Sequence, residues 1–349
     1  AARVPMKGRL DIPDRESPHV DSRAAGALVV EALRDRLPRN VQVENVTVNY
    51  YRPKGREGTV AGLRIDWRDA DADSGRTRSQ AGFLRWAPLA RLTEEAERCK
   101  ALHTEFARPF PAVTVLEAQE CSLQLFPFDR RLIRLGSCLR PRFVARMLEE
   151  AGIEWAAGDR GWRIRKRKAV WSLASYRPER RAVLRWDLQA WNDESAEKVA
   201  RSLVLRTCAG PWGVPSTIYP RLAAAGVPAP ALLAEPDEHT RIEEFVEGSA
   251  GDLARMPAER TLLRAGISTA RWHRKVRPDG LAPSKRRDLV ERARLSATTT
   301  SRFRPELEPV LQVRLDAAER ADGGPDPEVA LHGDLHPGQW IDTVHGVVF

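Results

Sequence analysis

The segment ALHGDLHPGQWID, at residues 330–342, combines two histidines, two aspartates, two glycines and a proline close to the end of the chain. Within it, Asp334 and Gln339 stand five positions apart. A carboxylate can orient an acceptor hydroxyl and take its proton, and a nearby carboxamide can reach the magnesium ion that shields phosphates. Gly333 permits a tight turn, and the Pro-Gly pair that follows redirects the backbone so that both side chains can face one cleft. The spacing therefore suits a loop that brings a carboxylate and a carboxamide to one cleft.

The two histidines of this loop have plainer interpretations. His332 stands beside the turn, where an imidazole more often holds a loop by hydrogen bonds than transfers a proton. His332 and His336 have the four-residue spacing of a metal site on a helix, but Pro337 and the neighbouring glycines argue against a helix here. Asp334 could also be a simple turn former.

Length and composition limit the possible size and class of the protein. At 349 residues and 42% hydrophobic, the chain can bury a sizeable core in more than one domain. The sequence has no long apolar run and no apolar centre of a signal peptide near its start, so we expect a cytoplasmic protein without a membrane partner. The four cysteines lie far apart, a pattern that favours reduced, packed thiols over disulfides or a zinc site.

A net charge of +9 raises the question of nucleic acid. Arginine outnumbers lysine 49 to 8 and is spread along the whole chain, which biased codon usage explains as well as phosphate binding does. The densest cluster, RGWRIRKRKAVW at 160–171, alternates basic and apolar residues like the solvated face of a strand or the segment leading into one. We therefore expect no nucleic-acid partner.

A repeat organises the first two thirds of the chain. The tetrapeptide LRID at 63–66 lies 121 positions before LRWD at 184–187, and FLR at 83–85 lies 121 positions before VLR at 204–206. Each copy is expected to run strand, turn, strand, connector, strand, helix, strand. Such a unit is a small antiparallel sheet that carries one helix.

Helices are predicted outside the repeated strands as well. A helix over 22–38 would be capped by Asp21 or Ser22 and stopped by Pro38. A short helix over 216–225 would end at Gly226. The remaining expected elements are helices at 257–276 and 307–321 and a final hairpin formed by WID and VVF, and the apolar face of the first of these helices would include positions 262–263, 266–267, 270 and 272.

At these residues the chain resembles the aminoglycoside phosphotransferase and choline kinase-like family, whose signature is H-G-D-x-x-x-x-N followed by a hairpin. The resemblance covers roughly 165–349, with RAVLRWDL and SLVLRTCAG as small-lobe strands, IEEFVEG as the linker to the large lobe and GISTARWHR as its first helix. It implies an α+β, protein kinase-like fold. In that fold an antiparallel-sheet small lobe, duplicated here, is followed by a partial helical large lobe.

The resemblance also implies roles for individual residues. Asp334 would be the catalytic base, Gln339 a magnesium ligand and Arg206 the cation on the phosphates. Backbone groups of Glu244, Phe245 and Val246 would contact adenine. The implied reaction uses ATP and magnesium and moves the γ-phosphate to a hydroxyl of a small molecule, namely a sugar, an amino sugar or an amino alcohol.

Three departures from the family pattern matter. Arg206 replaces the usual lysine, and its planar guanidinium cannot bind phosphate with the same geometry. The predicted helix at 216–225 contains no acidic residue to pair with that cation. Gln339 replaces asparagine, as it does in maltokinase-like members. A pseudokinase that binds nucleotide without chemistry, and less readily a basic nucleic-acid-binding protein, therefore remain as alternatives.

The domain organisation follows from the repeat and the resemblance. We expect an N-terminal helical segment (1–40), a degenerate small-lobe repeat (41–150), an ATP-binding small lobe (160–250) and a partial catalytic lobe (251–349). In the resembled family the last hairpin runs into a magnesium-binding aspartate and further helices, so we expect these residues to be the front part of a longer protein, inefficient in phosphotransfer by itself. The first repeat would act as a lid, docking surface or regulatory module.

Overall fold

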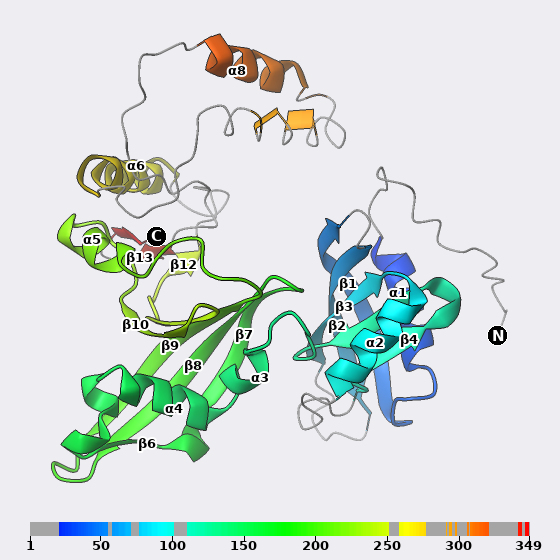
Figure 1. Cartoon of the computed structure of the whole chain (residues 1–349), viewed down its shortest axis with the longest axis horizontal. Coiled ribbons are helices and arrows are strands. Elements are labelled where there is room, and N and C mark those ends of the chain that lie inside the picture. Colours follow the sequence, from blue (N-terminus) through cyan, green and yellow to red (C-terminus); the bar gives the residue numbers. More distant parts are fainter. Residues whose placement is uncertain are drawn as a thin grey trace. The chain divides into compact units, whose positions relative to one another are not determined.

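The computed structural model describes residues 21–54, 58–70, 77–100, 110–250, 258–276, 308–320, 341–343 and 346–348, with a few single positions between 291 and 306. The chain forms two compact units. The first extends to Trp212 and includes Leu232–Phe245, and the second contains Gly213–Ala231 and the residues from Val246 onward. The described residues make a mixed α+β structure with antiparallel sheets, and none of their helices is long and apolar enough to cross a membrane (Figure 1).

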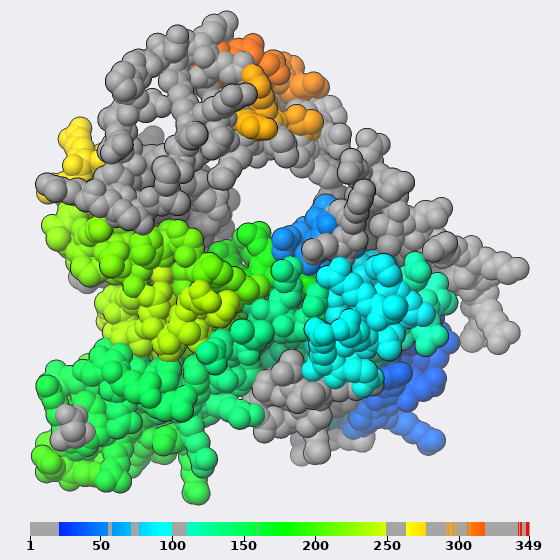
Figure 2. Space-filling model, viewed as in Figure 1, coloured from blue at the N-terminus to red at the C-terminus, as the bar shows by residue number. Residues whose placement is uncertain are grey.

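The first sheet lies in the first unit and has five strands in the order β1-β2-β3-β5-β4. Helix α2 (Leu89–Lys100) follows the third strand and precedes the fourth, and Figure 2 shows its outer surface in cyan. The strands are β1 (Val41–Pro53), β2 (Thr59–Asp69), β3 (Arg78–Trp86), β4 (Val113–Leu116) and β5 (Cys121–Leu125).

The second sheet of this unit has the same order in its main strands, β7-β8-β9-β11-β10. A short strand, β6 (Trp162–Ile164), is added on the other half of β8. Here too a helix follows the third strand in sequence, α5 (Ile218–Ala224). The strands are β7 (Val170–Arg177), β8 (Arg181–Asn192), β9 (Lys198–Cys208), β10 (Leu232–Asp237) and β11 (Thr240–Glu244).

One face of each sheet is covered by a helix that precedes it in the chain. Helix α1 (Ser22–Leu33) packs Leu28 and Leu33 into the core of the first sheet, and α4 (Pro141–Glu150) packs Leu148 into the core of the second. Burying a leucine contributes roughly 1.5–3 kcal/mol, so these helices stabilise the sheets they cover. The repeated unit therefore begins with a helix, which the sequence comparison did not include.

The N-terminal boundary of α1 agrees with the prediction and its C-terminal boundary does not. Asp21 is the cap, because its Oδ1 accepts a hydrogen bond of 2.6 Å from Ala24 N. The helix ends at Leu33, well before Pro38, and turns occupy the intervening residues. Pro38 thus follows the helix without stopping it.

The two sheets also repeat one polar cluster. Arg64 Nε donates to Asp66 Oδ1 at 2.8 Å, and Ser79 Oγ on the neighbouring strand donates to the same oxygen at 2.6 Å. The hydrogen bond from Ser79 is the main reason that the pKa of Asp66 is lowered. The second sheet repeats this arrangement with Arg185, Asp187 and Ser202, at 3.0 and 2.6 Å.

The two copies have equal sequence spacing, but the residues that pair across their strands are not at equivalent positions. Asp66 pairs with Ser79, whereas Asp187 pairs with Ser202, so the second hairpin contains two more residues between the partners. A slip of two residues leaves every side chain on its original face, because the side-chain period of a strand is two. The polar cluster and the core are therefore preserved in both copies.

The second unit contains the helical segments and a small third sheet. Helices α6 (Ala258–Lys275) and α8 (Glu308–Arg320) lie where the sequence predicts helices. The predicted final hairpin is also present, as β13 (Ile341–Thr343) and β14 (Gly346–Val348), with β12 (Ser249–Ala250) on its other side. Helix α5 has Ile218 and Leu222 buried.

The predicted buried face of α6 is wrong in part. Leu263 and Ile267 are 65% and 46% exposed, while Ala265 and Ser268 are buried. Trp272 does pack against the cluster around α5. Small residues therefore face the interior on one side of α6, where Ala265 contacts Val347 of β14.

All four cysteines are free thiols, as the sequence predicts. Cys99, Cys121 and Cys138 are buried, and Cys208 is half-buried. Burial raises the pKa of Cys99 and of Cys138 to about 12, so these thiols stay protonated at neutral pH.

Candidate functional site

Arg206, the predicted phosphate-binding cation, lies on β9 of the second sheet. Its side chain is 38% exposed and points away from the core that its neighbours Leu203 and Leu205 enter. The guanidinium Nε donates to Glu243 Oε2 of β11 at 2.7 Å. The cation is therefore present on the open face of the sheet and is held there by an acidic residue of the adjacent strand.

The predicted adenine contacts stand at the end of β11. Glu244 is the last residue of the strand and is exposed, and Phe245 N donates to Ser202 O of β9 at 3.3 Å. The Phe245 ring lies under the Arg185 guanidinium, with 4.2 Å between its centroid and the Arg185 Cζ atom. Val246 belongs to the second unit. The structure thus places Glu244 and Phe245 next to the strand that carries Arg206.

The predicted catalytic loop lies outside the described residues. Asp334 and Gln339, together with His332 and His336, belong to the stretch before β13 that the structure does not describe. Their roles as base and metal ligand stay predictions. The structure describes only the hairpin that follows the loop.

The first sheet contains a cation–acid pair that the sequence reasoning missed. Arg85 on β3 forms an ion pair with Glu95 of α2, with 2.8 Å between Arg85 Nε and Glu95 Oε2, although this contact lacks hydrogen-bond alignment. A pair between the third strand and the following helix is the arrangement that protein kinases use to hold their phosphate-binding lysine. The acids of the stretch TEEAE at 93–97 were the available signal.

In the described part of the second sheet, the third-strand cation pairs with a neighbouring strand. Helix α5 has no acidic residue in its sequence IYPRLAA, and the partner of Arg206 is Glu243 on β11. The corresponding residue on β5 of the first sheet is Gln124, which bonds Ser122 within that strand. The two copies therefore hold their third-strand arginines from different directions.

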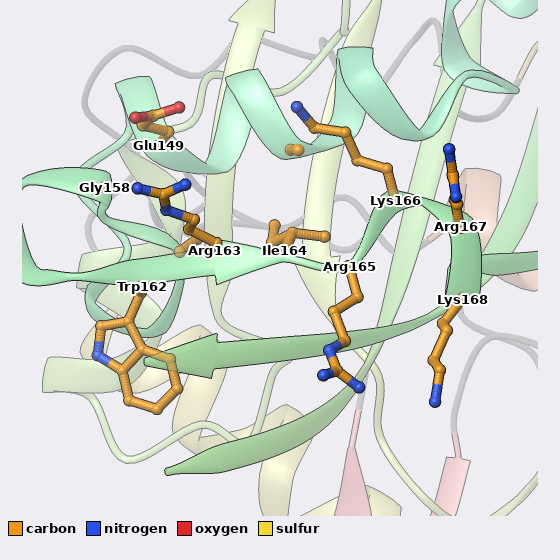
Figure 3. A pocket seen from close by; sticks show the side chains of 11 residues that line it. Glu149, Gly158, Trp162, Arg163, Ile164, Arg165, Lys166, Arg167 and Lys168 are labelled. Atoms are coloured by element: carbon orange, nitrogen blue, oxygen red, sulfur yellow. The ribbon is translucent and has the colours of Figure 1, made fainter. Parts of the chain in front are cut away.

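A basic groove of about 680 Å³ lies beside the second sheet (Figure 3). It runs between α4 and the segment 156–168, which includes the short 3-10 helix η6 (Lys166–Lys168). Figure 3 shows Lys166 and Arg167 extending to one side of this segment and Arg165 and Lys168 to the other. Because these cations diverge, the groove offers no single point at which a small anion would meet all of them.

This groove is expected to bind polyanions weakly and only at low salt. Arg165, Lys166, Arg167 and Lys168 stand together without an acidic residue between them, so a single-stranded oligonucleotide should bind through its phosphates. We expect that affinity to fall away between about 50 and 200 mM salt, as counterion release requires. Fluorescence anisotropy with a labelled oligonucleotide at stepped salt concentrations measures it.

A matched pair of charge reversals locates any such binding. The triple variant K166E/R167E/K168E should abolish the low-salt binding. The variant R34E/R36E/R39E makes the same change in net charge on exposed residues near α1 and should retain most of it. Binding that persists at physiological salt would contradict this expectation.

Comparison with known proteins includes a structural likeness. The sequence matches no known protein-family model and no curated protein. The structure is similar to that of an ethanolamine kinase from Plasmodium vivax, at 14% sequence identity and a TM-score of 0.35, over 73% of this chain and 67% of that chain. A likeness at this score and identity says nothing of what this chain binds or does.

Proposed function

We propose that the chain is the ATP-binding part of a small-molecule kinase with a protein kinase-like fold. The reaction would move the γ-phosphate of ATP to a hydroxyl of a sugar, an amino sugar or an amino alcohol, with magnesium as the cofactor. The observation that carries the proposal is Arg206, a partly exposed cation on the third strand of a β7-β8-β9-β11-β10 sheet. The H-G-D-x-x-x-x-Q loop at 332–339 supports it from the sequence.

The proposed role of each residue follows from the charges of the site. Arg206 would bind phosphate oxygens, and the backbone beside Glu244 and Phe245 would bind adenine. Asp334 would orient the acceptor hydroxyl and take its proton. Gln339 would hold the magnesium ion, which neutralises charge on the phosphates. Catalysis of this kind rests on positioning and on charge neutralisation around the γ-phosphate.

Replacing Arg206 by alanine tests the proposed nucleotide site. An arginine that binds a phosphate contributes a charged hydrogen bond, so we expect R206A to weaken ATP binding by about 10- to 100-fold. Isothermal titration calorimetry with ATP and magnesium measures the change. Arg201, an exposed arginine on the same strand, provides the control, because R201A should leave the affinity unchanged. Equal affinities of wild type and R206A would contradict the proposal.

A pseudokinase is the second candidate, and one observation favours it. Arg206 is engaged by Glu243, and the helix that would hold a phosphate-binding cation in an active kinase has no acidic residue. A protein of this kind would bind ATP and transfer no phosphate. Wild-type protein that binds ATP with a Kd sensitive to R206A, yet phosphorylates none of the acceptor classes, would support this reading.

A further inference from the structure

The turn between β7 and β8 carries a glutamate in an unusual conformation. Arg180 N donates to Arg177 O at 3.0 Å, which closes a β-turn with Pro178 second and Glu179 third. Glu179 has a φ of +57°, in the left-handed region where this turn position usually has glycine. Such strain persists only where the surroundings impose it, so the contacts of the Glu179 side chain call for an explanation.

The Glu179 carboxylate is bound by two cations of the first sheet. Its Oε2 lies 2.5 Å from Lys54 Nζ, and its Oε1 pairs with Arg85 Nη1. Lys54 directly follows β1, and Arg85 lies on β3. All three side chains are at most 4% exposed. A carboxylate taken this far out of water needs charged partners with good geometry, and the first sheet supplies them.

Arg85 is itself held in place by a second carboxylate. Glu95 of α2 contacts Arg85 from the other side, and its Oε1 lies 2.9 Å from Arg130 Nη2 and 3.1 Å from Arg91 Nε. Glu95 is 2% exposed and Arg85 is fully buried. The guanidinium of Arg85 is therefore fixed between two carboxylates, one from its own copy and one from the other.

The β7–β8 turn makes further contacts, with Asp129 after β5 and with β2. Tyr176 Oη and Glu179 N both donate to Asp129 Oδ2, at 3.0 and 2.7 Å. Pro178 lies so close to β2 that a Cβ added at Gly62 would stand 3.3 Å from its Cδ. Burial raises the pKa of Asp129 and raises that of Tyr176 well above its usual value, which fits a contact without water.

We propose that the first sheet contains a carboxylate-binding site, formed by Arg85 and Lys54, whose ligand is the Glu179 side chain of the same chain. This binding fixes the β7–β8 turn. Arg85 lies on the third strand of its sheet, as Arg206 does, but the two-residue shift in pairing puts the two arginines at different register positions, opposite Val60 and Val183. The third-strand cation of the first sheet thus already holds a carboxylate. The first sheet is then a module that positions the second, without a nucleotide of its own. The Glu179 contact does not require that the second sheet bind ATP.

Replacing Glu179 by glycine and adding propionate tests the site directly. Glycine accepts the positive φ, so E179G removes the carboxylate without adding backbone strain. Propionate has the carbon and oxygen atoms of the lost side chain. We expect E179G to melt below the wild type, and about 50 mM propionate to raise the Tm of the variant by roughly 3 °C or more. The wild type should not respond.

Two controls separate carboxylate binding from general effects of the additive. Propionamide has the shape of propionate without its charge, and sodium chloride at equal ionic strength supplies charge without the shape. Neither should raise the Tm of E179G. Propionate should also restore slow hydrogen exchange of the amide at position 179, which donates to Asp129 in the wild type. Equal responses to propionate and propionamide, or no response to either, would overturn the proposal.

A second set of variants keeps the test decisive if E179G does not fold. E179Q retains the shape of the side chain and removes its charge, and K54M removes one of the two cations that bind it. We expect both single variants to melt below the wild type. The double variant should lose less than the sum of the two, because each single change breaks the same ion pair. A wild-type Tm for E179Q, or strictly additive losses, would refute a bound carboxylate.

Discussion

Substituting asparagine for Asp334 is expected to slow phosphotransfer to a hydroxyl acceptor by about 10²- to 10⁴-fold, the usual contribution of a positioned general base. Asparagine keeps the size of the side chain and cannot accept the proton of the hydroxyl. ATP affinity should stay the same, because the proposed role of Asp334 concerns the acceptor. Transfer of labelled γ-phosphate to glucose, glucosamine and ethanolamine by the full protein measures the rate for each acceptor class.

Asp316 provides a matched control for this substitution. It lies on α8, where its Oδ1 accepts a hydrogen bond of 2.7 Å from Gln312 on the surface of the helix. D316N makes the same chemical change and should keep the wild-type rate. If D334N transfers phosphate as fast as the wild type does, Asp334 is not the base. If the wild type binds ATP but transfers labelled phosphate to none of the acceptors, that result supports the pseudokinase proposal.

The duplication of the antiparallel sheet could be predicted from sequence because alternation and repetition are local signals. The LRID and LRWD tetrapeptides mark β2 and β8, and each of them carries the arginine and the aspartate of the same polar cluster. Side chains alternate between faces along a strand, so a motif of this kind fixes which residues face the core. Two equal motifs therefore predict two similar sheets.

The partners in the ion pairs were harder to predict, because the partner of a charged side chain can come from anywhere in the chain. The resembled family has the acid that pairs with this cation in the helix after β9, where this sequence has none, and the structure has the acid on β11 as Glu243. Glu179 lies 94 residues from Arg85, and nothing in the local pattern RPERR shows that its carboxylate is buried. A charged residue in a hairpin turn is ordinarily solvated, and only the tertiary structure reverses that expectation.

The structure describes some of the predicted site residues and not others. Arg206 lies on β9, and Glu244 on the adjacent β11 pairs with Leu203, three residues from Arg206 along β9. Phe245 bonds Ser202 of the same strand. Asp334 and Gln339 were predicted from motif spacing alone, and they lie outside the described residues. A motif names the chemistry of a loop, but the packing around that loop decides where its side chains point.

Replacing Arg85 by methionine is expected to destabilise the first unit by about 3–5 kcal/mol, the cost of removing one partner from a buried ion pair. Methionine fills much of the space and leaves Glu95 and Glu179, which are at most 2% exposed, without the guanidinium between them. Urea unfolding followed by tryptophan fluorescence measures the loss. The midpoint should fall while the dependence of the free energy on urea concentration stays the same.

Arg91 is the control for this experiment, because it contacts the same carboxylate from the surface. Its Nε lies 3.1 Å from Glu95 Oε1, but its side chain is 36% exposed, so R91A should cost at most about 1 kcal/mol. A triple change, R85M with E95Q and E179Q, removes both buried negative charges along with the cation and should recover part of the loss. If R85M is no less stable than R91A, the carboxylates are reached by water. The cluster would then be an ordinary surface network, and the first sheet would have no buried ion pair with which to hold the turn of the second.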